Sequence, residues 1–165
     1  RDDAIHLANA SSDGLTVEVV NPVWFKVPAA PYAAALMENR RFELNEVIAR
    51  FHELAEKYDH ILIEGAGGWE VPLNEFSTMA DFAQRLALPV IVVVNNKLGC
   101  LNHTILTVRN IQARGLTCAG IILNYVKDER DAASISNRMA LEHFLDVPVL
   151  AEIMHGETEI DWPIA

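Results

Sequence analysis

The stretch Ile61-Leu62-Ile63-Glu64-Gly65-Ala66-Gly67-Gly68-Trp69 decides the fold that the sequence predicts. Three branched apolar residues without a polar break are typical of a strand buried on both faces of a parallel sheet. Glu64 then stands at the carboxyl end of that strand, where open α/β sheets bind their ligands. Gly67 lets the backbone turn tightly and approach a ligand without a Cβ in the way. The alternative is a tight turn in which Glu64 only faces solvent.

The rest of the chain alternates between helical and strand-like patterns. Apolar spacing predicts helices at 3–10, 31–37, 44–57, 79–87, 101–114 and 130–145, and apolar runs predict three further strands at 89–94, 119–123 and 147–153. Three prolines within ten residues, from Pro22 to Pro31, predict a stiff extended loop. This order predicts a doubly wound α/β fold, with a mostly parallel sheet and helices on both faces. We expect residues 1–165 to form a single domain, because this length supports one sizeable core.

Composition excludes several classes of protein. The net charge of −10 argues against nucleic acid as a partner, because nucleic-acid binding needs a basic face. No apolar run approaches the ~20 residues of a membrane span, so we expect no membrane partner. Cys100 and Cys118 lack the spacing of a metal site or a disulfide framework, which favours a reducing cytoplasm.

Four loops follow the predicted strands, at 64–69, 95–99, 124–125 and 153–156. The carboxyl ends of parallel strands meet at one edge of a sheet, so we expect these loops to converge. An acid, a glycine-rich turn, a lysine and an asparagine fit a nucleotide-phosphate site better than a Ser-His-Asp hydrolase. The chain contains no G-x-S-x-G nucleophile elbow.

The candidate residues within these loops carry alternative interpretations. Glu64 fits a magnesium ligand, with Asp3 as a candidate second acid. Asn102 is either an N-cap of the helix that begins near Leu98 or a ligand-binding residue at that helix terminus. Lys97 is either a solvated surface lysine or a site residue. Asn124 either presents its amide to a purine edge or serves only as a turn residue.

Several motifs together resemble those of the ATP-dependent dethiobiotin synthetases of biotin synthesis. The resemblance covers nearly the whole chain, and the motifs that carry it are Glu64-Gly-Ala-Gly-Gly68 with its preceding strand, Val71-Pro-Leu73, Ala87-Leu-Pro-Val-Ile-Val-Val-Val94 and Lys97-Leu-Gly-Cys-Leu-Asn-His-Thr104. The resemblance implies a P-loop NTPase-like fold. It also implies a reaction in which 7,8-diaminononanoate, CO2 and ATP give dethiobiotin, ADP and phosphate, through a carbamate and a carbamic-phosphoric anhydride.

The resemblance also implies roles for individual residues. Asp3 and Glu64 would hold Mg2+ on the ATP phosphates, and Gly67 would let substrate and phosphate approach the backbone. Asn124 would contact adenine. The substrate carboxylate would meet a helix N-terminus of the neighbouring subunit in a homodimer, at Gly99, Cys100, Leu101 and Asn102.

The chain departs from the family pattern at its start. No Gly-Lys-Thr or Gly-Lys-Ser occurs, so the resemblance implies that the P-loop, its lysine and the catalytic lysine lie in an N-terminal segment outside residues 1–165. We therefore expect this chain alone to be a poor catalyst of low stability, with no catalytic residue of its own. The family often has Ile-Pro after its last strand, where this chain has Ile153-Met154. Two alternatives are a non-catalytic paralogue that serves as a binding or dimerising module, and a fragment of a cobyrinate-type amidating synthetase.

Overall fold

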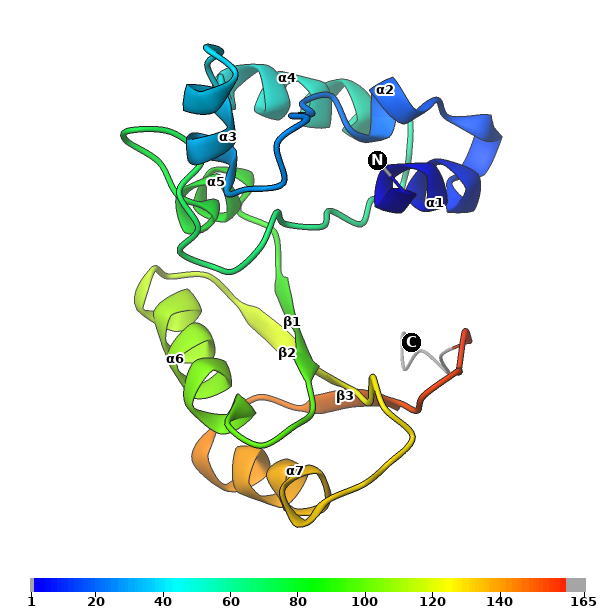
Figure 1. Ribbon diagram of the computed structural model, residues 1–165, viewed down its shortest axis with the longest axis vertical. Helices are drawn as coiled ribbons and strands as arrows, with labels where there is room; N and C mark the ends of the chain where they lie inside the picture. The colour runs from blue at the N-terminus through cyan, green and yellow to red at the C-terminus, as the bar shows by residue number, and fades with distance from the viewer. Residues whose placement is uncertain (1, 160–165) are drawn as a thin grey trace. The chain divides into compact units, whose positions relative to one another are not determined.

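The computed structural model describes residues 2–159, which divide into two compact units. The N-terminal unit ends at Leu86 and the C-terminal unit begins at Ala87. Figure 1 labels the elements of both units, and each unit is described by itself below. Within the described residues, no helix is long and apolar enough to cross a membrane.

The C-terminal unit is a parallel α/β layer. Its strands, β1 (Val90–Asn95), β2 (Cys118–Asn124) and β3 (Val149–Ile153), are adjacent in that order and all parallel (Figure 1). Helix α6 (Cys100–Ala113) connects β1 to β2, and α7 (Ala132–Phe144) connects β2 to β3. The predicted parallel sheet and its three later strands are therefore confirmed.

The ends of these helices follow from their sequence. Gly115, with φ 76°, ends α6 in a left-handed turn in which Leu116 donates a hydrogen bond to the Ile111 carbonyl. Asp131 begins α7 through a reciprocal capping box with Ser134. Right-handed crossovers between consecutive neighbouring strands place α6 and α7 on the same face of this sheet, and the two helices contact one another. Helices on both faces of the sheet therefore remain a prediction.

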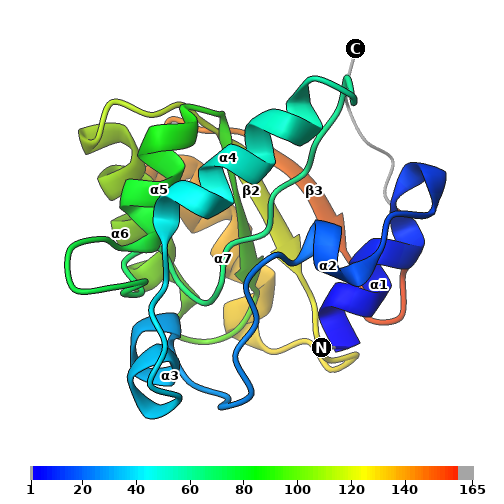
Figure 2. The same cartoon turned by 90° about the horizontal axis from the view of Figure 1, so that it is seen from above.

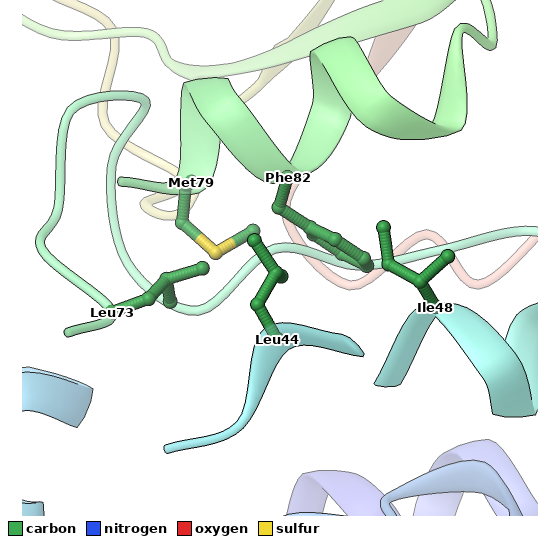
Figure 3. Close-up of a cluster of buried hydrophobic side chains, with 5 residues drawn as sticks. All are labelled: Leu44, Ile48, Leu73, Met79 and Phe82. Carbon is green, nitrogen blue, oxygen red and sulfur yellow. The ribbon is translucent and has the colours of Figure 1, made fainter. Parts of the chain in front are cut away.

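The N-terminal unit is helical. It contains α1 (Asp2–Ala10), a 3-10 turn η1 (Ser12–Gly14), α2 (Val17–Val20), α3 (Pro31–Met37), α4 (Leu44–Ala55) and α5 (Met79–Leu86). Figure 2 shows α4 and α5 side by side, and between them lies a core of Leu44, Ile48, Leu73, Met79 and Phe82 (Figure 3). The turn α2 was not predicted. Pro22 and Pro28 lie in the irregular loop that the sequence indicates, and Pro31 begins α3.

The predicted strand at residues 61–63 is wrong for the described structure. These residues form no strand, and Leu62 is 92% exposed and Ile63 38% exposed. A strand needs a hydrogen-bonded neighbour, and the described part of the N-terminal unit supplies none, since its one isolated bridge joins Pro72 to Thr78. Apolar content alone therefore did not make this run a buried strand.

Candidate functional site

The turn after Glu64 is anchored on the core of the N-terminal unit. Glu64 itself is exposed and lies in irregular chain. A Cβ built on Gly65 would lie 3.0 Å from the Met79 Cε, so the turn runs closely over a core side chain. Beyond the turn, Val71 packs against the same core, and its carbonyl accepts a hydrogen bond of 2.9 Å from the Met79 amide. The Glu64 carboxylate is therefore exposed to solvent, and the turn that follows it directly is held against the core.

Gly67 lines an open groove of about 440 Å³ in the same unit. Its backbone is left-handed, with φ 79°, and a Cβ there would lie 3.0 Å from the Val71 Cγ2. The lining residues are mostly apolar: Pro28, Ala29, Ala30, Pro31, Ala66, Gly67 and Val71. The two sides are joined where the Tyr32 amide donates to the Pro72 carbonyl at 3.2 Å. The sequence pointed to Gly67 but not to the proline segment that forms the facing wall. The density of prolines in that segment was the signal that could have indicated a stiff wall.

The two acids that the resemblance assigns to Mg2+ both lie in the N-terminal unit. Asp3 is in the first turn of α1, beside Asp2, and is exposed like Glu64. Among residues 2–159, neither carboxylate has a hydrogen bond or an ion pair. Carboxylate oxygens are the donors that Mg2+ prefers, so their chemistry fits this ion. No group of three or more His, Cys, Asp and Glu residues within the described chain could hold a metal by itself. A magnesium ion there would need further oxygen ligands, such as water or phosphate.

Asn124 lies at the carboxyl edge of the sheet in the C-terminal unit. It ends β2, in register with Asn95 of β1 and Ile153 of β3. Its carbonyl accepts a hydrogen bond of 2.9 Å from the Asn96 amide, which holds the β1 loop against the end of β2. The half-buried side chain of Asn124 is therefore carried by a well-connected part of the backbone.

A buried asparagine pair that sequence analysis missed supports this edge. The Asn96 side chain is 6% exposed, and its Nδ2 donates to the Ser134 carbonyl at 3.0 Å. The Asn137 Nδ2 donates to the Asn96 Oδ1 at 2.8 Å and to the Lys97 carbonyl at 3.2 Å. These bonds fasten the loop after β1 to α7. The doubled asparagine directly after an apolar strand was the only sequence signal.

Tyr125, directly after Asn124, begins a second polar network. Its hydroxyl donates to the Glu152 Oε2 at 2.6 Å, and Arg138 pairs with the other oxygen of Glu152. Burial raises the pKa of the Tyr125 phenol, and the bond to Glu152 adds to this effect. Burial also acts to raise the pKa of the Glu152 carboxyl, but hydrogen bonds from Tyr125 and Arg138 outweigh it and lower the pKa. The guanidinium of Arg130 lies over the Tyr125 ring, 5.0 Å from its centroid.

The residues from Gly99 to Asn102 form the N-terminus of α6. Gly99 is the N-cap, with φ 91°, so the interpretation of Asn102 as the N-cap is wrong. Asn102 is instead the third residue of the helix, and its side chain is exposed. Cys100 is fully buried, and its amide donates to the Lys97 carbonyl at 3.1 Å. Its thiol therefore belongs to the core, whereas Gly99, Leu101 and Asn102 retain exposed atoms.

The predicted site residues thus fall into two groups, one in each unit. The N-terminal unit carries Asp3, Glu64 and Gly67, and Gly67 is the member that lines a groove. The C-terminal unit carries Asn124, which is the last residue of β2, and the residues from Gly99 to Asn102, which follow the carboxyl end of the neighbouring parallel strand β1. The convergence of the two groups remains a prediction.

Comparison with known proteins defines the family. An AAA domain family model matches residues 2–158, in agreement with the parallel α/β architecture. The chain is 39% identical over 164 residues to the ATP-dependent dethiobiotin synthetase BioD of Akkermansia muciniphila, covering 99% of this chain and 77% of that protein. It is 40% identical to the protein of the same name from Aromatoleum aromaticum, over 93% of this chain and 68% of that protein. The match to the Bacillus subtilis protein of that name is 36% identical, over 90% of this chain and 64% of that protein.

The chain therefore belongs to the ATP-dependent dethiobiotin synthetase family. It spans from 64% to 77% of the length of these three relatives.

Proposed function

We propose that this protein is a dethiobiotin synthetase that uses ATP and Mg2+ to join 7,8-diaminononanoate and CO2. The observation that carries the proposal is the apolar groove beside Gly67, close in sequence to the exposed carboxylate of Glu64, in a chain that belongs to this family. The groove suits the alkyl chain of a diamino acid, because its walls are prolines, alanines and a valine. The relatives matched carry this activity in their names, which favours it over a cobyrinate-type amidation.

The proposed chemistry proceeds in three steps. One substrate amine attacks CO2 and loses a proton, which gives a carbamate. A carbamate oxygen then takes the γ-phosphoryl group of ATP and releases ADP. The second amine attacks the carbonyl carbon of this carbamic-phosphoric anhydride and releases a proton to solvent, the C–O bond to phosphate breaks, and the ureido ring closes. Phosphoryl transfer depends mainly on positioning and charge neutralisation, so the protein's task is to orient the reactants.

We assign these tasks to the predicted residues. Asp3 and Glu64 would hold Mg2+, which neutralises phosphate charge when bound. Gly67 keeps the turn free of a side chain, so that substrate can lie against the backbone. Asn124 would offer an amide to the adenine edge. Its place directly before the Tyr125–Glu152 hydrogen bond supports this role, because that bond restrains the end of β2.

The test measures dethiobiotin formation from labelled bicarbonate by the gene product that carries this sequence. Glu64→Gln keeps the shape of the side chain but loses its charge, and we expect kcat to fall by more than about tenfold, with a raised Mg2+ requirement. Glu53→Gln is the matched control, because Glu53 is an exposed acid of the same unit that pairs with Arg50. Absence of product from the wild type would overturn the proposal, and full activity of Glu64→Gln would remove the role of Glu64.

We further propose a homodimer in which Gly99, Cys100, Leu101 and Asn102 of one subunit receive the substrate carboxylate bound to the other. The start of α6 supports this because Gly99 and Asn102 are exposed there, and the amides of a helix N-terminus together with the Asn102 side chain suit an anion. Cys100 is buried and its amide is bonded to the Lys97 carbonyl, so it would act by holding this turn in place. Asn102→Asp would repel that carboxylate. Mixing equal amounts of Asn102→Asp and Glu64→Gln subunits should restore about a quarter of wild-type activity. About half of the dimers are then mixed, and each mixed dimer has one intact site out of two. No restoration after subunit exchange would contradict the shared site. A cytoplasmic location remains a proposal, in keeping with two free cysteines.

A further inference from the structure

The wall of the groove formed by Pro28–Pro31 needs an external support. Residues 21–30 have no regular secondary structure. Three prolines in and beside this segment, Pro22, Pro28 and Pro31, have no amide hydrogen to donate. Within it, the Ala29 amide donates to the Val27 carbonyl at 2.9 Å. A groove wall of this kind holds its position only if side chains from elsewhere fix it.

Glu38 fixes the segment directly before the wall. It follows α3, and its Oε1 accepts hydrogen bonds from two consecutive backbone amides, Lys26 at 2.5 Å and Val27 at 2.9 Å. Hydrogen bonds to an ionised carboxylate are about twice as strong as neutral ones. The side chain of Glu38 is only 14% exposed, so water competes weakly for this oxygen.

Arg40 contacts Trp24 and Phe25, the two residues directly before Lys26. Its Nη1 donates to the Trp24 carbonyl at 2.7 Å and lies 3.4 Å from the Glu38 Oε2. The guanidinium also lies over the Phe25 ring, 4.7 Å from the centroid. Arg40 is itself fixed on α3, because its amide donates to the Ala35 carbonyl at 2.8 Å. Glu38 and Arg40 thus bind four consecutive residues, 24–27, to the end of one helix.

These contacts connect both ends of the wall to α3. Pro31 is the first residue of α3, and Glu38 follows its last residue. The wall therefore joins α3 at one end through the chain and at the other end through the Glu38–Val27 hydrogen bond. If the Glu38 carboxylate is lost, the residues directly before Pro28 lose both amide bonds to α3, and the nearest remaining hydrogen bond on that side is the one from Arg40 to Trp24. Pro28 and Ala29 are then less restrained, and the groove opposite Gly67 is less narrowly defined in width.

We propose that Glu38 and Arg40 are positioning residues that set the width of the groove and thereby its affinity for the alkyl chain of the diamino acid. The inference rests on the proposed function, because it takes the diamino acid as the occupant of the groove. It assigns no contact between substrate and either side chain. It predicts that binding of the diamino acid depends on these residues, whereas binding of ATP does not.

The test uses the gene product that carries this sequence and compares Glu38→Ala with Glu53→Ala, which breaks an exposed ion pair on α4. NMR amide exchange reports on the Lys26 and Val27 amides, and calorimetry gives separate Kd values for 7,8-diaminononanoate and ATP. In Glu38→Ala we expect exchange at both amides and the Kd of the diamino acid to rise by about tenfold or more, with the Kd of ATP unchanged. Glu38→Gln keeps an acceptor oxygen and should recover much of both effects. Glu53→Ala should match the wild type in all three measurements.

The outcomes separate the inference from the proposed function. Faster exchange at Lys26 and Val27 with wild-type affinity for the diamino acid overturns the inference and leaves the function standing. A wild type that binds no diamino acid overturns both. Should Glu38→Ala fail to fold, Arg40→Lys decides, since it keeps the charge but loses the planar group on Phe25. A rise of several fold in the Kd of the diamino acid supports the inference, and an unchanged Kd overturns it.

Discussion

Replacing Gly67 by alanine tests the groove and its backbone together. Gly67 has φ 79°, where an L-residue with a Cβ pays about 1–2 kcal/mol. Part of this cost, about 0.4–1 kcal/mol, is offset because alanine restricts the unfolded chain. The new Cβ would lie 3.0 Å from the Val71 Cγ2, so Val71 must shift by a few tenths of an ångström. We expect Gly67→Ala to lower the free energy of unfolding by about 1 kcal/mol.

The matched control is Gly14→Ala in the same unit. Gly14 has φ 62°, and no atom lies within 4 Å of a Cβ built there, so this change carries the backbone cost without the contact. Urea unfolding and calorimetric binding of 7,8-diaminononanoate are measured on both variants. Both should be destabilised by a similar amount, but only Gly67→Ala places a methyl group at the groove. We expect the Kd of the diamino acid to rise about tenfold in Gly67→Ala and to stay at its wild-type value in Gly14→Ala.

Two results would contradict a role for the groove in substrate binding. Wild-type affinity in Gly67→Ala would show that the groove does not receive the substrate at this turn. Equal loss of affinity in both variants would show that binding responds to general destabilisation rather than to the methyl group.

Three further predictions concern the C-terminal unit. A Cβ on Gly120 would lie 2.5 Å from the Leu150 Cγ and 2.7 Å from the Pro148 carbonyl oxygen. Gly120→Ala should therefore lower the free energy of unfolding in urea by about 1–3 kcal/mol, and a loss below about 0.5 kcal/mol would contradict this expectation. Asp131→Ala removes the acceptor of the Ser134 amide and should lower the midpoint of thermal unfolding, while an unchanged midpoint would show that the cap is dispensable. Because the pKa of Glu152 is lowered in the folded state, its stabilising contribution is present above its unfolded pKa and is lost as pH falls through its folded pKa. Glu152→Gln should therefore reduce the loss of stability on acidification, and an identical acid limb in the pH profile would argue against it.

The sequence predicted the C-terminal unit well because its signals are local and agree with one another. The apolar runs at 89–94 and 119–123 are separated by a helical pattern that ends at Gly115, and the structure has β1, α6 and β2 there. Short right-handed crossovers leave few arrangements for such a run, so the parallel sheet follows from the order of elements. Helix α5 likewise begins on a local contact, in which the Thr78 amide donates to the Asp81 carboxylate at 2.7 Å.

The candidate site was predictable only in part. Glu64, Gly67 and the residues from Gly99 to Asn102 stand out because charge and glycine follow apolar runs. The supporting groups Asn96, Asn137 and Glu38 do not stand out, because their partners are backbone atoms distant along the chain. A hydrogen bond between Glu38 and Val27 has no signature in residue spacing.

By itself, the sequence determined the parallel α/β class of fold, the positions of most helices and the family to which this protein belongs. These depend on periodicity, capping residues and motif order, all of which are properties of short stretches. Tertiary structure alone decided that the run Ile61–Ile63 is not a strand, because a strand exists only with a neighbour that takes up its backbone hydrogen bonds. It also decided that a proline segment and Gly67 form one groove, with Glu38 and Arg40 behind the wall, because contacts across tens of residues depend on how the chain folds back on itself.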